Sequence, residues 1–211
     1  GTMGSQLEAL GISTDFVPGV LMARLVEGGL HFGLGSTLAF RREHLNAIGG
    51  FEAIADYLAD DYELGKRIAD RGLKVRLSTQ VVETFLPPYS FSEFWTHQLR
   101  WASTIRVSRP GGYAGLLITY TLPWAILCVV FARGAPWSLI LFVAAIALRS
   151  VAALVTSVSV LGDKQAASAL WLLPHRDLLA PIAWVGGLLG RKIVWRGEQF
   201  RLEKGKLVRV R

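Results

Sequence analysis

Two long apolar runs in the second half of this 211-residue chain restrict what it can fold into. Residues 113–132 contain no charged side chain, and residues 137–161 contain Arg149 as their one charge. A bilayer core of roughly 30 Å is crossed by about 20 helical residues, so each run is long enough to span it. The sequence therefore predicts two membrane-spanning helices, and it predicts that Arg149 has a partner or a route to the interface.

A third apolar stretch, residues 166–195, is harder to interpret because His175, Arg176, Asp177 and two prolines interrupt it. Either it forms a third span, or it is re-entrant. The basic tail favours a re-entrant piece, because two crossings keep the tail and the first half of the chain on the same side of the membrane. Arg176 and Asp177 either pair with each other at the interface or line an entrance for a lipid acceptor.

The charge of the chain is concentrated at its end. The net charge is +7, and residues 191–211 hold eight Lys or Arg and two Glu. A basic segment directly after apolar helices favours contact with anionic lipid headgroups on the cytoplasmic side and argues against nucleic acid. Cys128 is the one cysteine, which excludes a disulfide framework and a cysteine-based zinc site.

Residues 1–108 are predicted to form a water-soluble α/β segment. Ser5 and Glu8 predict a capping box for one short helical turn that ends at Gly11, and Pro18-Gly19 predicts a break before a short helix. The other predicted elements are strands over residues 31–41, 74–78 and 80–85, helices over 42–48, 60–70 and 92–107, and a small hairpin in residues 199–211.

The helix predicted over residues 92–107 begins at Ser92, with Glu93 in its first turn. It has an apolar stripe and a second face with His97, Arg100 and Trp101. Because it directly precedes an apolar span, we expect it to lie flat at headgroup depth.

Two short motifs carry the residues suited to chemistry. Asp60 and Asp61 start a predicted helix, with Asp60 as N-cap and Glu63 completing a capping box; taken alone, such a pair is a cap. If Asp60 caps, Asp61 lies in the first turn as an ionised carboxylate able to accept a proton. Arg100-Trp101 taken alone is an interfacial anchor, but it also suits a diphosphate and a sugar.

The order of several motifs resembles the C-terminal half of a membrane glycosyltransferase with a GT-A fold, of family 21 or 2. It is most similar to ceramide glucosyltransferases and bacterial hopanoid-associated glycosyltransferases. The motifs are GSTLAFRR (35–42), IGGF (48–51), ADDY (59–62), IADRG (68–72), LSTQVV (77–82), RW (100–101) and WRGEQFRL (195–202).

The resemblance implies inverting transfer of a sugar from a nucleotide-diphosphate sugar to a membrane lipid hydroxyl. Asp61 matches the catalytic base. The substrate-binding residues would be Gly35, Ser36, Asp60, His97, Gln98, Arg100 and Trp101. His97 departs from the family pattern, which has Gln or Arg at this position.

The resemblance also implies a divalent cation, Mg²⁺ or Mn²⁺, held by an Asp-x-Asp motif in an upstream nucleotide-binding half. No such motif precedes His31, so this chain is expected to carry the acceptor side, to provide no metal ligands and to be inactive by itself. Residues 1–108 would be the catalytic half, 109–195 the membrane region and 196–211 a cytoplasmic tail. The expected location is a bacterial inner membrane, with the catalytic part facing the cytoplasm.

Two other functions remain open from the sequence. A polysaccharide synthase shares the Asp-Asp and Arg-Trp motifs, but this chain has few apolar spans with which to build a polymer channel. A membrane-anchored binding module would need Asp61 only as a cap and Arg100 only as an anchor.

Overall fold

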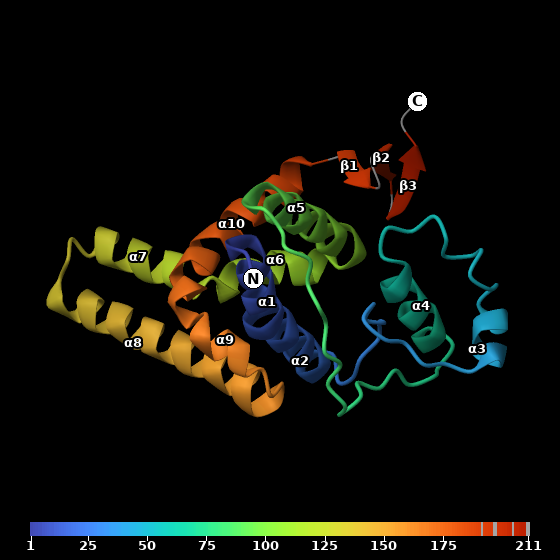
Figure 1. Ribbon diagram of the computed structural model, residues 1–211, viewed down its shortest axis with the longest axis horizontal. Coiled ribbons are helices and arrows are strands. Elements are labelled where there is room, and N and C mark those ends of the chain that lie inside the picture. Colours follow the sequence, from blue (N-terminus) through green and yellow to red (C-terminus); the bar gives the residue numbers. More distant parts are fainter. Residues whose placement is uncertain (191, 196–197, 204, 210–211) are drawn as a thin grey trace.

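The computed structural model describes residues 1–190, 192–195, 198–203 and 205–209, and most of them are helical (Figure 1). The helices are α1 (Met3–Gly11), η1 (Ile12–Phe16), α2 (Val17–Val26), α3 (Arg42–Ala47), α4 (Asp60–Ala69), α5 (Phe91–Ser108), α6 (Pro110–Thr119), α7 (Thr121–Phe131), α8 (Pro136–Leu154), η2 (Val155–Val160), α9 (Lys164–Ser168), η3 (Leu170–Leu172) and α10 (Leu173–Leu189). The strands are β1 (Lys192–Trp195), β2 (Glu198–Glu203) and β3 (Lys206–Arg209).

Residues 3–26 form one continuous helix, not the short turn and broken chain predicted from the sequence. Thr2, and not Ser5, caps it, and a π-helical segment, η1, joins α1 to α2. Pro18 is tolerated because the hydrogen bond that it cannot donate would go to the Thr14 carbonyl, and the Arg149 guanidinium donates to that carbonyl at 2.9 Å. A contact from a distant helix thus replaces the missing backbone bond.

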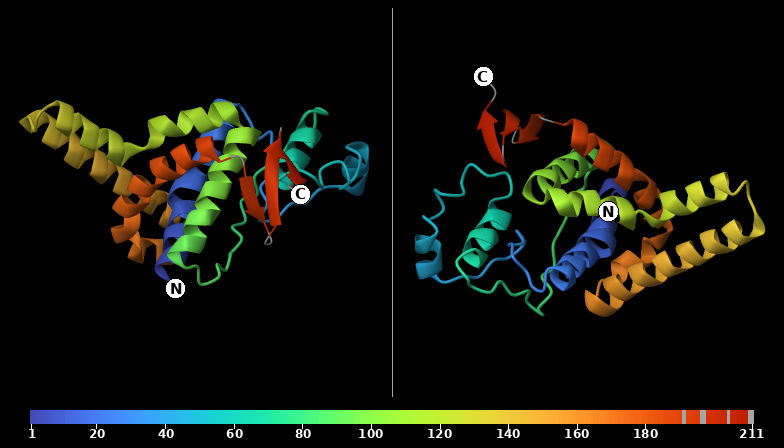
Figure 2. Two further views of the ribbon diagram at one scale, coloured as in Figure 1. Left: turned by 90° about the horizontal axis from the view of Figure 1, so that it is seen from above. Right: turned by 180° about the vertical axis from the view of Figure 1, so that it is seen from behind.

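Helices α1, α5 and α10 pack side by side to form the body of the molecule (Figures 1 and 2). Their shared core contains side chains that are fully or almost fully buried. These are Leu7, Leu10, Phe94, Ala153, Ala166, Leu172 and Leu173. Helix α5 agrees closely with the predicted helix, but Ser90 caps it, and not Ser92, because Glu93 then completes a capping box with Ser90.

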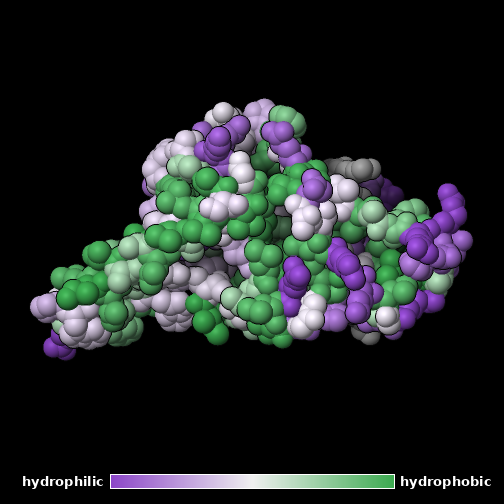
Figure 3. Space-filling view, turned by 90° about the horizontal axis from the view of Figure 1, so that it is seen from below, coloured by the Kyte–Doolittle hydropathy of each residue, from purple (hydrophilic) through white to green (hydrophobic). Residues whose placement is uncertain are grey.

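Helices α7 and α8 pack against each other and project from the body as an arm (Figure 1). Seen from below, this arm is mostly apolar, whereas polar residues gather at the other end of the molecule (Figure 3). Pro136–Val160 is long and apolar enough to cross a membrane, which confirms the second predicted span. The length and composition of this helix suggest association with a membrane.

The first predicted span, residues 113–132, is not one straight helix. It is divided between α6 and α7, which meet at an angle of 52° at Tyr120, so the pair is a broken span or a re-entrant loop. Met3–Val26 also has the length and composition of a span, although sequence analysis placed it in the water-soluble part. Four of its polar residues, Ser5, Glu8, Ser13 and Thr14, are buried, so the first part of this helix packs within the body.

The segment between α2 and α5 lies at the opposite end from the arm (Figure 1). The strands predicted over 31–41, 74–78 and 80–85 are wrong: these residues lack regular strands, and one isolated bridge joins Leu30 to Val75. They are held by side-chain packing instead of a ladder. Phe32 and Leu30 are buried with Val20 of α2, and Tyr62, Val75 and Leu77 pack around them.

Helices α3 and α4 appear where predicted, and a small core of Ile48, Ile54, Leu64 and Ile68 holds them together. The glycines that follow α3, Gly49 and Gly50, have φ values of 96° and 74°, which explains why glycine ends this helix.

The predicted C-terminal hairpin is confirmed as β2 and β3, and β1 extends it to a three-stranded antiparallel sheet. Among the described residues, this is the one sheet; the parallel sheet of a GT-A domain is not seen there. The hairpin docks beside α4, because the Leu58 amide donates to the Gly205 carbonyl at 3.0 Å and Lys206 lies over the Tyr57 ring.

Candidate functional site

Helix α4 begins with the acidic pair, but not with the predicted cap. Ala59 precedes the helix and Asp60 is its first residue, so the Asp60–Glu63 capping box is wrong. The exposed Asp60 carboxylate accepts a hydrogen bond from the Asp61 amide at 2.9 Å. Asp60 therefore stabilises the first turn, where the helix dipole favours negative charge. The Asp61 side chain is not needed to cap the helix.

Asp61 lies against the glycine-containing segment 33–35. A β-carbon on Gly35 would lie 2.8 Å from Asp61 Oδ2, and one on Gly33 would lie 2.3 Å from the Asp61 carbonyl. One turn later, a β-carbon on Gly65 would lie 2.0 Å from the Gly33 amide nitrogen. Three glycines thus let backbone and carboxylate approach each other. The structure brings Gly35 to Asp61, whereas the neighbouring Ser36 is exposed.

The environment of Asp61 favours its protonated form. Burial removes water from the carboxylate and raises its pKa above the ordinary value of 3.8; the backbone amides of Tyr62 and Gly35 partly oppose this, and the charge of Asp60 adds to it. A carboxylate with raised proton affinity is a better proton acceptor than a fully hydrated one.

Helix α5 places His97 and Gln98 against a carboxylate that sequence analysis had assigned to a cap. Glu8 of α1 accepts from His97 Nδ1 at 2.7 Å and from Gln98 Nε2 at 2.6 Å. Glu8 and Gln98 are buried. The signal in the sequence was a charged residue inside an apolar helix, Met3–Val26, which is unfavourable unless the charge has partners.

Trp101 lies one turn beyond His97 on the same helix. Its ring centroid is 5.4 Å from that of His97 and 5.4 Å from that of Phe16 in η1. The Arg100 guanidinium makes no hydrogen bond or ion pair with any described residue, so its donors remain available.

The acidic pair Asp60-Asp61 and the α5 residues 97–101 do not contact each other directly among the described residues. One apolar cluster lies between them. Phe16, which contacts Trp101, packs against the cluster of Val20, Leu30 and Phe32. Phe32 stacks on Tyr62, the residue after Asp61, with ring centroids 5.5 Å apart. The two motifs therefore border the same cluster.

Arg109 ties the C-terminal end of α5 to this cluster. Its guanidinium lies over the Phe32 ring, 4.5 Å from the centroid, and pairs with the Glu27 carboxylate. The position of α5 relative to Phe32 is thus fixed by a cation–π contact and an ion pair.

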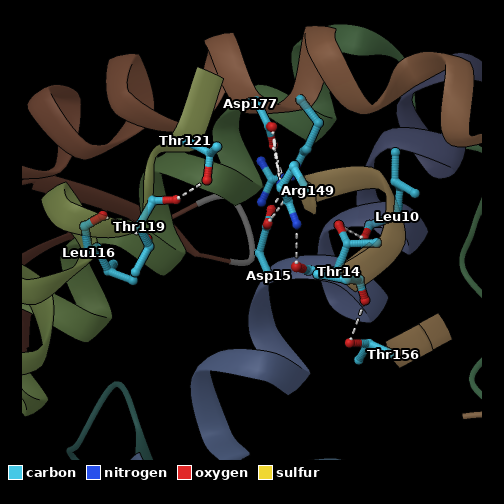
Figure 4. Close-up of polar contacts among 11 residues, drawn as sticks. Leu10, Thr14, Asp15, Leu116, Thr119, Thr121, Arg149, Thr156 and Asp177 are labelled. Carbon is cyan, nitrogen blue, oxygen red and sulfur yellow. Dashed lines mark hydrogen bonds and ion pairs between the residues drawn. The ribbon is translucent and has the colours of Figure 1, made fainter. Parts of the chain in front are cut away.

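A cluster of four charged residues lies where α8, α10 and η1 meet. Figure 4 shows Arg149 between Asp15 and Asp177. Arg149 donates to Asp177 at 2.8 Å and to Asp15 at 2.6 Å. Arg176 Nε lies 3.2 Å from Asp15 Oδ2. The predicted pairing of Arg176 with Asp177 is therefore wrong, whereas the expectation that Arg149 has a partner is confirmed. Arg176 and Asp177 instead pair with residues of other helices, because successive helical residues point away from each other.

Gly11 was predicted to end a helix, but it lies in the middle of one and faces this cluster. A β-carbon there would lie 2.5 Å from Arg176 Nε, so the absence of a side chain lets the guanidinium lie against α1. A shallow pocket opens beside the cluster, and Arg149, Ser150, Trp171 and Asp177 are among its lining residues.

The described residues do not fit the divalent cation that the resemblance implies. Among them, no three His, Cys, Asp or Glu side chains converge as metal ligands. Asp60 already binds a backbone amide, and Asp61 lies against Gly35.

Comparison with known proteins gives one assignment. No solved structure matches the chain. The family model for glycosyl transferase family 21 matches residues 1–208, almost the full length, including α4, α5, the apolar arm and the tail. This match agrees with the order of the two motifs on the successive helices α4 and α5, and glycosyltransferase activity follows from the family. The chain belongs to glycosyl transferase family 21.

Proposed function

We propose that the protein transfers a sugar, with inversion, from a nucleotide-diphosphate sugar to the hydroxyl of a membrane lipid of the ceramide or hopanoid kind. The observation that supports this most is the position of Asp61: a half-buried carboxylate with raised pKa, beside the same apolar cluster that Trp101 borders, in a family 21 chain with membrane-length helices.

In this proposal Asp61 is the general base. The lipid oxygen attacks the anomeric carbon of the sugar, and its proton passes to the Asp61 carboxylate. The bond between that carbon and the diphosphate breaks, and the leaving nucleoside diphosphate keeps the electron pair. Attack on the side opposite the diphosphate inverts the configuration. A base of suitable proton affinity contributes about 10²–10⁴-fold to such a step.

Arg100 and Trp101 take the other side of the reaction. The Arg100 guanidinium makes no hydrogen bond or ion pair with the described residues, so its N–H donors can stabilise the charge that develops on the diphosphate. Trp101, fixed by Phe16 and His97, provides an aromatic wall for the sugar or the acceptor. Gly35, Ser36 and Asp60 would border the substrate from the α4 side.

We further propose a membrane orientation. Residues 1–108 form the acceptor side of a GT-A catalytic unit, residues 109–195 the membrane region, and the basic tail faces the cytoplasmic surface of a bacterial inner membrane. The exposed apolar arm and the positive tail support this arrangement. A donor-binding half and its divalent cation would complete the site.

Lipid extraction after incubation with labelled donors tests the proposal. Membranes containing the full-length protein, supplied with labelled nucleotide-diphosphate sugars, should produce label in the organic phase, and NMR of the product should show an inverted anomeric centre. Label in an insoluble polymer, or retained configuration at the anomeric carbon, would contradict it. Membranes without the protein are the control.

A further inference from the structure

Glu8 is a buried carboxylate whose two oxygens both bind side chains of α5. Its side chain is 1% exposed, Oε1 lies 2.7 Å from His97 Nδ1, and Oε2 lies 2.6 Å from Gln98 Nε2. Burying a carboxylate is costly unless it is paired and hydrogen-bonded, and both conditions are met here. The sequence separation of about ninety residues makes this a tertiary contact between α1 and α5.

This contact determines which nitrogen of His97 faces outward. An ionised carboxylate can only accept hydrogen bonds, and the Glu8 carboxylate accepts one from Gln98 and one from His97. Nδ1 of His97 therefore carries the hydrogen in its bond to Glu8. The other ring nitrogen, Nε2, makes no hydrogen bond with the described residues, and the side chain remains 18% exposed. Tyr89 and Trp101, with ring centroids at 5.8 and 5.4 Å, hold the imidazole from two sides.

His97 occupies the same face of α5 as the residues proposed to bind substrate. Arg100 and Trp101 follow it by three and four residues, which places all three side chains next to one another on the helix. His97 therefore shares a helix face with Arg100 and Trp101, and its ring lies 5.4 Å from the Trp101 ring.

We infer that Glu8 is a positioning residue of the acceptor site, which holds His97 so that Nε2 binds a hydroxyl group of the acceptor lipid. This inference rests on the proposed function. A hydroxyl both donates and accepts, so it matches Nε2 whether the imidazole is neutral or protonated. The role follows the logic by which a buried carboxylate fixes the orientation and tautomer of a histidine in other enzymes.

Acceptor kinetics of the full-length enzyme separate positioning from a merely structural role. Glu8→Gln should lower kcat/KM for the lipid acceptor by about tenfold or more, a size typical for loss of a histidine's orienting partner, and leave KM for the nucleotide sugar unchanged. Glu93→Gln is the matched control, because it makes the same change at an exposed position of α5, and it should leave both constants unchanged.

A double variant makes the test specific. His97→Gln removes the imidazole that Glu8 orients, so adding Glu8→Gln to it should lower acceptor kcat/KM by less than about twofold further. If Glu8→Gln lowers this constant equally in both backgrounds, Glu8 does not act through His97 and the inference is wrong. It is also wrong if the single variant leaves acceptor kinetics unchanged.

A measurement that needs no activity keeps the inference testable if Glu8→Gln fails to fold. The ¹⁵N chemical shifts of the imidazoles in the full-length protein, with His97 assigned by its loss in His97→Gln, should show hydrogen on Nδ1. A bare Nδ1 would overturn the inference. Absence of any sugar transfer to lipid would defeat the proposed function while the Nδ1 result still stood, so the two failures are distinguishable.

Discussion

Arg149 and Asp15 pair at 2.6 Å between two helices that are each long and apolar enough to cross a membrane. Asp177 of α10 binds the same Arg149 guanidinium, as Figure 4 shows. Arg176 pairs with the Asp15 carboxylate, so two positive and two negative charges compensate one another. An apolar helix tolerates Arg149 because its charge is satisfied inside the protein and does not face lipid.

Removing Arg149 should destabilise the fold strongly. Arg149→Leu leaves the buried Asp177 carboxylate and the partly exposed Asp15 carboxylate without this guanidinium. The Thr14 carbonyl also loses the donor that Arg149 provides. Breaking a buried pair in this way costs about 3–5 kcal/mol. Unfolding of the full-length protein in detergent measures it.

The exposed pair Lys66–Asp70 provides the control for this prediction. Asp70→Asn should change the unfolding free energy by less than about 1 kcal/mol, because solvent screens an exposed ion pair. Equal losses of unfolding free energy in Arg149→Leu and Asp70→Asn would show that the buried cluster stabilises the fold no more than an exposed ion pair does.

Gly65 permits the close packing of α4 on residues 32 and 33. In Gly65→Ala the new β-carbon would lie 2.0 Å from the Gly33 nitrogen, so backbone must move; such overpacking costs about 1–3 kcal/mol. Thermal unfolding measures this loss of stability, with Gly19→Ala as the control. Gly19 is a helical glycine with nothing within 4 Å of the added carbon, so its substitution should be neutral or stabilising by up to about 1 kcal/mol. A stable Gly65→Ala protein would refute the close approach.

Gly35→Ala tests whether the position of the Asp61 carboxylate matters for turnover. The added carbon would lie 2.8 Å from Asp61 Oδ2, which moves the proposed base without adding a group to the interior of α4. A displacement of about 1 Å lowers turnover by about 10²-fold, so kcat for transfer to lipid should fall far more than the melting temperature does. Unchanged kcat with a folded protein would mean that this carboxylate position is unimportant for turnover.

The raised pKa of Asp61 also predicts a pH dependence of stability. The folded protein binds the proton more tightly than the unfolded chain, whose Asp has a pKa of 3.8, so the contribution of Asp61 to stability declines as pH rises from 3.8 through the raised value. At neutral pH Asp61→Asn removes an unfavourable buried charge and should raise the melting temperature. Below pH 3.8 the difference between the two proteins should disappear. A variant that is less stable at neutral pH would contradict burial as the cause.

The sequence predicted the parts of this molecule that depend on local signals. The span ending at Val160, the helices α3, α4 and α5, and the tail hairpin follow from apolar length and from the glycines that end helices, whereas the caps predicted at Ser5, Asp60 and Ser92 were wrong. Family membership also followed from the order of motifs, because several short patterns at fixed spacing are more specific than any one alone.

The errors arose where a distant residue overrides a local rule. Pro18 predicted a break, but the Arg149 guanidinium takes the carbonyl that Pro18 leaves without a donor. Residues 31–41 predicted a strand, but side-chain packing and glycine contacts with α4 hold them without a partner strand. Glu8 read as a cap because its partners, His97 and Gln98, lie some ninety residues away.

Turnover of Asp61→Asn in the full-length protein tests the central claim most directly. Asparagine keeps the shape of the side chain but does not accept the hydroxyl proton, so kcat for transfer to lipid should fall by at least about 100-fold while the protein stays folded. Asp70→Asn, the same change at the exposed end of the same helix, should retain full turnover. A folded Asp61→Asn protein with wild-type kcat would contradict the assignment of Asp61 as the base.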